Sequence, residues 1–221
     1  RGPLQKVDGL MGQVILVRHG QASWGAADYD VLSPLGETQA TAVGRALKDV
    51  QPTVVVHGEM KRQADTARLA VEAAGWAIGT TTDPRWNEFD SLDVLSQCPA
   101  PFAGDDPTAQ EFQQWFELAT SRWVSGGSGT YSETWVDFAA RAMAGLEALA
   151  HSGTAVVFSS GGPISAVASA LLSGGGAVYE RMTPVVVNAS ISKVILGRRG
   201  TTLVSFNEHS HLQTGDLLTY R

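Results

Sequence analysis

The chain has 221 residues, of which 43% are hydrophobic, so it can build one large domain or two small ones around a sizeable core. It has 16 basic and 22 acidic residues, and the resulting net charge of −6 disfavours binding to nucleic acid or to an anionic membrane. No apolar run approaches the roughly 20 residues that span a bilayer. Cys98 is the single cysteine, so no internal disulfide can form. Together with the lack of a signal-peptide pattern, this indicates a cytoplasmic protein.

The first ten residues precede Met11 and show no periodic pattern. We interpret residues 1–10 as a tag or loose extension. Residues 11–221 contain no internal repeat and no linker composition, so we expect them to form a single domain.

A short apolar run rich in β-branched residues, residues 14–17, predicts a buried strand. Arg18, His19 and Gly20 follow it directly. Polar groups at the carboxyl end of a buried strand lie where open α/β sheets bind their ligands. The planar donors of Arg18 suit a phosphate group, and His19 can act as a nucleophile if its free nitrogen faces the ligand.

The next elements alternate between helix and strand. Ser33 and Pro34 predict the start of an amphipathic helix over residues 34–49. Residues 53–57 predict a second buried strand, and Arg62 comes after its carboxyl end, in a helix that runs to about residue 74. This alternation favours an α/β fold in which helices cover both faces of a parallel sheet.

Residues 83–131 interrupt this alternation, because they hold four prolines and little strand pattern before an aromatic-rich helix at 108–124. We interpret this stretch as an insertion over the site. The remaining pattern predicts a helix from residue 135 to 149, a strand at 155–158, a helix to about 172, and strands at 185–187, 191–196 and 203–206.

Four stretches resemble, in the same order, the motifs of the histidine phosphatase superfamily in its phosphoglycerate mutase-like branch. They are Arg18 to Gln21, Met60 to Ala67, Asn87 to Phe89 and Ser159 to Gly162. The resemblance extends from about residue 11 to 212. It implies a three-layer α/β/α sandwich with a mostly parallel central sheet.

The resemblance also implies site residues. His19 would be the nucleophile that becomes phosphohistidine, Arg18 and Arg62 would hold the phosphate oxygens, and Glu88 would be the acid. Asp90 is a competing candidate for the acid, and Lys61 is the expected exposed neighbour of Arg62. No cofactor is implied, and no metal is expected because no His, Cys and Asp cluster has metal-ligand spacing.

Ser160 is the main departure from the family, because most members carry a second histidine there. The Ser160 hydroxyl and the Gly161 amide, at the start of a helix, could still bind phosphate. His209 or His211 could compensate for the missing imidazole, although a structural or surface role is the simpler interpretation. Gly58 departs as well, since many relatives have serine there.

The sequence therefore predicts a phosphomonoester hydrolase acting on a small phosphorylated substrate. One alternative is a weak or inactive member of the family that only binds phosphorylated ligands or phosphoproteins. A phosphoglycerate mutase is less favoured, because residues 83–131 hold eight carboxylates but only two cations, Arg85 and Arg122. The substrate and the oligomeric state are not determined by the sequence.

Overall fold

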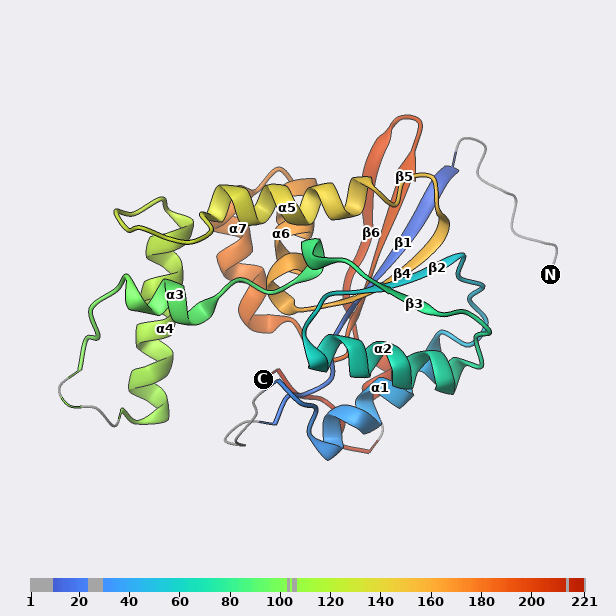
Figure 1. Cartoon of the computed structure of the whole chain (residues 1–221), viewed down its shortest axis with the longest axis horizontal. Helices are drawn as coiled ribbons and strands as arrows, with labels where there is room; N and C mark the ends of the chain where they lie inside the picture. The colour runs from blue at the N-terminus through green and yellow to red at the C-terminus, as the bar shows by residue number, and fades with distance from the viewer. Residues whose placement is uncertain (1–9, 24–29, 103, 105–106, 214, 221) are drawn as a thin grey trace.

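The structure, a computed structural model, describes residues 10–23, 30–102, 104, 107–213 and 215–220. These residues contain a sheet in the strand order β3-β2-β4-β1-β5-β6 (Figure 1). β3, β2, β4 and β1 run parallel, whereas β5 is antiparallel to both β1 and β6. The strands are β1 (Leu10–Arg18), β2 (Val54–His57), β3 (Thr80–Thr82), β4 (Gly153–Ser159), β5 (Ile191–Gly197) and β6 (Gly200–Glu208).

Helices cover both faces of this sheet (Figure 1). They are α1 (Pro34–Ala46), α2 (Lys61–Ala74), α3 (Ser91–Ser96), α4 (Ala109–Val124), α5 (Trp135–Glu147), α6 (Gly161–Leu171) and α7 (Gly175–Met182). None of those that the described residues form is long and apolar enough to cross a membrane.

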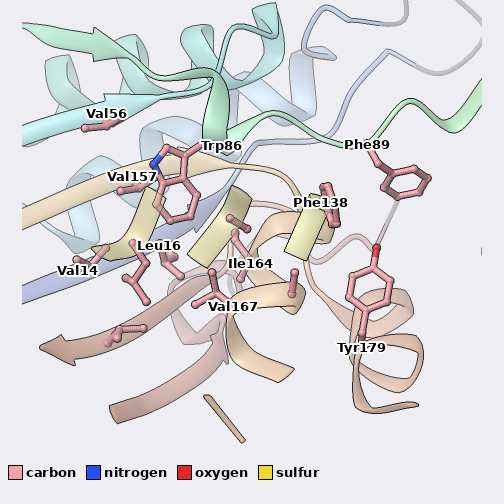
Figure 2. Packing of buried hydrophobic residues seen from close by; sticks show 14 of the residues in the cluster. Val14, Leu16, Val56, Trp86, Phe89, Phe138, Val157, Ile164, Val167 and Tyr179 are labelled. Carbon is pink, nitrogen blue, oxygen red and sulfur yellow. The ribbon is translucent and has the colours of Figure 1, made fainter. Parts of the chain in front are cut away.

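The side chains of β1 alternate between two hydrophobic clusters, as the two-residue period of a strand requires. Ile15 packs in one cluster, with α1 and α2. Val14 and Leu16 pack in the other, with Ile164 of α6 and Phe138 of α5, as Figure 2 shows. A sheet buried on both faces confirms the predicted three-layer α/β/α sandwich with its mostly parallel sheet.

The parallel register brings the carboxyl ends of β1, β4 and β2 to one edge of the sheet. Arg18 lies opposite Ser159, and the His19 amide donates to the Ser159 carbonyl at 2.8 Å. His57 lies opposite Phe158 on the other side of β4. The segments that follow these three strands therefore meet at this edge, which is where the sequence placed the candidate site.

The predicted strand at residues 185–187 is wrong. A 3-10 helix spans Thr183–Val185, and no strand includes Val186 or Val187. Some backbone groups here pair within the local turn, as the Val186 amide does with the Thr183 carbonyl, and others pair with side chains. The Val186 carbonyl accepts from the Arg18 guanidinium, and the Val187 amide donates to Asn207 Oδ1 at 2.8 Å.

One short strand and two short α-helices were not predicted. β3 is a three-residue strand of exposed threonines, and α7 begins at Gly175 within a run of glycines that is typical of a loop. α3 has six residues and follows its N-cap residue Asp90, whose carboxylate accepts from the Leu92 and Asp93 amides. β1 also begins at Leu10, inside the stretch interpreted as an extension, while residues 1–9 lie outside the described residues.

Residues 83–131, predicted to be an insertion over the site, hold a 3-10 helix (Pro84–Trp86) followed by α3 and α4. Trp86 is fully buried against the sheet (Figure 2). The Phe89 ring stacks on Trp123 of α4 with 4.8 Å between ring centroids. This packing fixes the backbone on both sides of Glu88.

Candidate active site

His19 follows β1 and is only 5% exposed. Its Nδ1 lies 2.7 Å from the Gly20 carbonyl, which can only accept a hydrogen bond, so Nδ1 carries the ring proton. The Nε2 lone pair then accepts from Arg62 Nε at 3.2 Å. These contacts select the tautomer in which Nε2 is the nucleophilic nitrogen.

Burial lowers the pKa of His19 well below 6.5, and the charges of Arg62 and then Arg18 lower it further. The hydrogen bond to Gly20 acts in the opposite direction but does not reverse the shift. The imidazole is therefore neutral at neutral pH and stays neutral into mildly acidic solution, as a nitrogen nucleophile requires.

The loop that carries His19 is fixed by a close approach to α1. A Cβ at Gly20 would lie 2.3 Å from the carbonyl oxygen of Gly36, so no side chain fits there. The Gly20 amide also donates to Thr66 Oγ1 at 3.1 Å, and that hydroxyl donates to the Arg62 carbonyl at 2.6 Å. The loop after β1 and the beginning of α2 are therefore joined through the Thr66 hydroxyl.

Arg62 lies in the first turn of α2 and is 8% exposed, whereas its neighbour Lys61 is exposed. Arg62 Nη1 forms a 2.6 Å ion pair with Asp30 Oδ1, and Asp30 also accepts from the Lys61 amide at 2.8 Å. The ion pair holds the guanidinium over His19. The contrast between Arg62 and Lys61 follows the sequence prediction.

Arg18 is held by backbone carbonyls. Its Nη1 donates to the Val186 carbonyl and, at 2.9 Å, to the Tyr220 carbonyl. A Cβ at Gly161 would lie 3.6 Å from Arg18 Nε, so the side chain runs along the start of α6. Two guanidinium groups thus lie around the same edge of the sheet as His19.

Glu88 accepts hydrogen bonds from the Gly162 amide at 3.0 Å and from the Phe89 amide at 3.2 Å. A Cβ at Gly162 would lie 1.9 Å from Glu88 Oε1, so the carboxylate needs a glycine at this position. Burial raises the pKa of Glu88 above 4.5, although the Gly162 amide, Arg62, the Phe89 amide and Arg18 oppose the shift. Asp90, the competing candidate, instead caps α3 and is exposed.

Ser160 is fully buried, and its Oγ accepts from Gln63 Nε2 at 2.8 Å. The sequence analysis did not identify Gln63 as part of the site. His209 and His211 instead make their ring contacts with backbone carbonyls, of Asn207 at 2.7 Å and Ala189 at 3.0 Å. Most family members have a histidine at the position of Ser160. In this protein the side chain that contacts Ser160 is Gln63, and neither His209 nor His211 is seen to replace the missing imidazole.

A cavity of about 380 Å³ lies between α4 and α7. Its wall includes Phe116, whose ring centroid is 6.3 Å from that of Phe89, the residue after Glu88. Pro184, in the same wall, comes two residues before Val186, whose carbonyl binds Arg18. These neighbours relate the cavity to the candidate site, although none of His19, Arg18, Arg62 and Glu88 lines it.

The charges in this wall are acidic. Glu117 and Glu180 line the cavity, and no lysine or arginine among the described residues does so. As for metal binding, no group of three His, Cys, Asp or Glu side chains in the described ranges could hold an ion.

Comparison with known proteins identifies relatives that include phosphatases. A metal-independent phosphoserine phosphatase from Arabidopsis thaliana is 25% identical over 224 residues, covering 95% of this chain and 87% of that protein. A probable phosphoglycerate mutase GpmB from Erwinia tasmaniensis is 36% identical over 93 residues, and the match spans 39% of this chain and 42% of that protein.

A solved structure shows the same fold. A phosphoserine phosphatase variant from Entamoeba histolytica, in complex with phosphoserine, superposes with a TM-score of 0.69 at 21% identity, covering 91% of this chain and 100% of that one. Residues 14–209 match the histidine phosphatase superfamily (branch 1), which is most of the chain. The protein therefore belongs to the histidine phosphatase superfamily.

Proposed function

We propose that the protein hydrolyses small phosphomonoesters through a phosphohistidine intermediate at His19. The observation that carries this proposal is the arrangement of His19, whose proton is held on Nδ1 by Gly20 while Nε2 faces the Arg62 guanidinium. A neutral nitrogen nucleophile beside a fixed cation is what transfer of an anionic phosphoryl group requires. Membership of a family that contains phosphatases supports the same conclusion.

In the first step, Nε2 of His19 attacks phosphorus and the bond from phosphorus to the ester oxygen breaks. Glu88 donates its proton to that oxygen, so the leaving group departs as an alcohol. Arg62 shifts its donors from Nε2 to the phosphoryl oxygens, where Arg18 and the Gly161 amide provide further positive potential.

In the second step, water attacks the phosphorus of phosphohistidine and Glu88, now a carboxylate, accepts its proton. The bond from phosphorus to Nε2 breaks and inorganic phosphate leaves. His19 returns to its neutral form and Glu88 to its acid form, so the cycle consumes only ester and water. Trapping acid-labile phosphate on His19 during turnover tests this scheme.

The alternative of a protein that binds phosphorylated ligands or phosphoproteins without hydrolysing them is motivated by Ser160, where the family imidazole is missing. Release of phosphate from an aryl phosphate distinguishes the two functions. Hydrolysis is favoured because the raised pKa of Glu88 and the lowered pKa of His19 both serve catalysis and are not needed for binding alone.

Activity on alkyl phosphates should require a protonated Glu88 and a neutral His19. At the ordinary pKa values of 6.5 for histidine and 4.5 for glutamate, few molecules would hold a neutral imidazole and a protonated carboxyl group at the same time. The pKa of His19 is lowered and that of Glu88 is raised, so more molecules hold both forms. We expect kcat/KM for an alkyl phosphate to fall as pH rises through the Glu88 pKa. Glu88→Gln should cost about 10²–10⁴-fold with that substrate and much less with p-nitrophenyl phosphate, which needs little protonation.

Parallel pH profiles for Asp90→Asn provide the control, because Asp90 is exposed and caps α3. An equal loss on both substrates in Glu88→Gln would refute the assignment of Glu88 as the acid.

The cavity between α4 and α7 is our candidate for the leaving-group pocket. Its two carboxylates repel a leaving group that carries a carboxylate, so we expect a neutral or cationic leaving group to be preferred. Glu117→Gln and Glu180→Gln should each raise kcat/KM for phosphoserine relative to that for phosphoethanolamine by about two- to tenfold. Glu147→Gln, an exposed carboxylate on α5, is the matched control, and an equal effect of all three variants would exclude this pocket.

A further inference from the structure

Gln63 lies next to Arg62 in the first turn of α2 and is fully buried. Its Nε2 donates to the Trp86 carbonyl at 3.1 Å and to Ser160 Oγ at 2.8 Å. These two acceptors belong to segments that are far apart in the sequence, the 3-10 helix at 84–86 and the residue before α6. Gln63 therefore joins them by a single amide group.

Both segments lead to the Glu88 carboxylate. Trp86 comes two residues before Glu88, and Ser160 comes two residues before Gly162, whose amide donates to that carboxylate at 3.0 Å. Ser159 Oγ adds a second link, because it donates to the same Trp86 carbonyl at 2.8 Å. We propose that Gln63 and Ser160 form a clamp that positions Glu88, and that Ser160 acts through this clamp and not as a ligand of the phosphate.

The contacts of Ser160 support a role in the clamp. Ser160 is the residue at the N-cap of α6, yet its side chain makes no capping hydrogen bond. Its Oγ is instead occupied by Gln63 Nε2, and the side chain is 0% exposed. A side chain that binds the phosphate must be accessible to the bound ester. A side chain that positions Glu88 needs only its partners within the protein.

The orientation of the Gln63 amide is fixed by its partners. The Trp86 carbonyl can only accept, so Nε2 must face it and Oε1 must point away. A Cβ at Gly58 would lie 2.0 Å from that Oε1 atom. The glycine at 58 thus makes room for the glutamine, and the two family departures at positions 58 and 160 are connected through Gln63.

The test uses a leaving-group comparison. This inference rests on the proposed role of Glu88, so Gln63→Met, which keeps the side-chain volume, is compared with Glu88→Gln on β-glycerophosphate and p-nitrophenyl phosphate. We expect Gln63→Met and Ser160→Ala to lower kcat on β-glycerophosphate by about tenfold or more, within the range of general-acid effects, and on p-nitrophenyl phosphate by less than about threefold. Inhibition by orthovanadate should change by less than about threefold, because the phosphate ligands remain.

Combining the variants tests the same point without relying on a single rate. Gln63→Met should add little to the loss on β-glycerophosphate when Glu88 is already glutamine, because the clamp then has no acid to position. Gln39→Met, which removes another fully buried glutamine amide that lies on α1, is the matched control and should affect both substrates alike.

The following outcomes would overturn the clamp. Equal losses on both substrates in Gln63→Met and Ser160→Ala would show a general structural effect, and parent-like rates would show no role. A large loss of orthovanadate inhibition in Ser160→Ala would make Ser160 a phosphate ligand. If Glu88→Gln itself fails to separate the substrates, the proposed acid is wrong. If Glu88→Gln loses more activity on β-glycerophosphate than on p-nitrophenyl phosphate and Gln63→Met does not, the clamp is wrong while the role of Glu88 as the acid stands.

Discussion

Replacing His19 with alanine should lower phosphate release from p-nitrophenyl phosphate by about 10³-fold or more, because the variant has no nucleophile for the first step. The acid-labile phosphate that the parent accumulates in a rapid-quench experiment should also disappear. The fold should survive, since His19 lies after the end of β1 and its side chain is not part of either hydrophobic cluster. Thermal unfolding of the variant checks that point.

His57 provides the control for this experiment. It is also a histidine at the end of a parallel strand, and its Nδ1 lies 2.6 Å from the carbonyl of the following residue, Gly58, as His19 Nδ1 lies next to Gly20. No arginine contact is found at the His57 ring within the described part of the chain. We expect His57→Ala to retain most of the activity, and undiminished turnover in His19→Ala would rule out the phosphohistidine mechanism.

The difference between these two histidines explains what the sequence could predict. Both follow a short run of buried β-branched residues, so strand and position were predictable for each. The partner of His19 is Arg62, 43 residues away, and it reaches the imidazole because β1, β4 and β2 are parallel and end at one edge. The family resemblance indicated this pair, whereas local pattern alone did not.

Ser160 illustrates the part of the site that could not be predicted. A serine in place of histidine at a helix start suggests, from the sequence alone, a weaker phosphate ligand. The contact that decides its surroundings comes from Gln63, 97 residues away, and depends on which way an amide group points. A glutamine in the first turn of an amphipathic helix gives no periodic signal that shows whether its amide is buried or exposed.

Short elements were missed for a different reason. α7 is predicted poorly because it begins in a glycine run, and its burial comes from Tyr179, which packs against Trp135 with 4.3 Å between ring centroids. Tertiary contacts of this kind override weak local propensity. The long elements with a regular hydrophobic period, α4 among them, were therefore predicted, while α7, which forms the other side of the cavity, was not.

Arg62→Ala should lower kcat/KM for p-nitrophenyl phosphate by about 10²–10³-fold, the range seen when one fixed donor to a transition-state oxygen is removed. The loss should grow as the pH is lowered. The charge of Arg62 lowers the pKa of His19, so removing it raises that pKa and leaves more of the imidazole protonated at any acidic pH. A pH profile of the variant should therefore fall on its acidic side at a higher pH than the profile of the parent.

Two variants distinguish this effect from a general loss of positive charge. Lys61→Ala removes the neighbouring exposed cation and should change kcat/KM by less than about threefold. Arg62→Lys keeps a charge but has a single ammonium, which cannot contact His19 Nε2 and Asp30 Oδ1 with separate nitrogens as the guanidinium does. It should recover the acidic side of the pH profile more than it recovers the rate. A buried guanidinium 3.2 Å from the nucleophile acts on it much more strongly than a solvated lysine can. Equal, small losses in Arg62→Ala and Lys61→Ala would therefore show that Arg62 takes no part in catalysis.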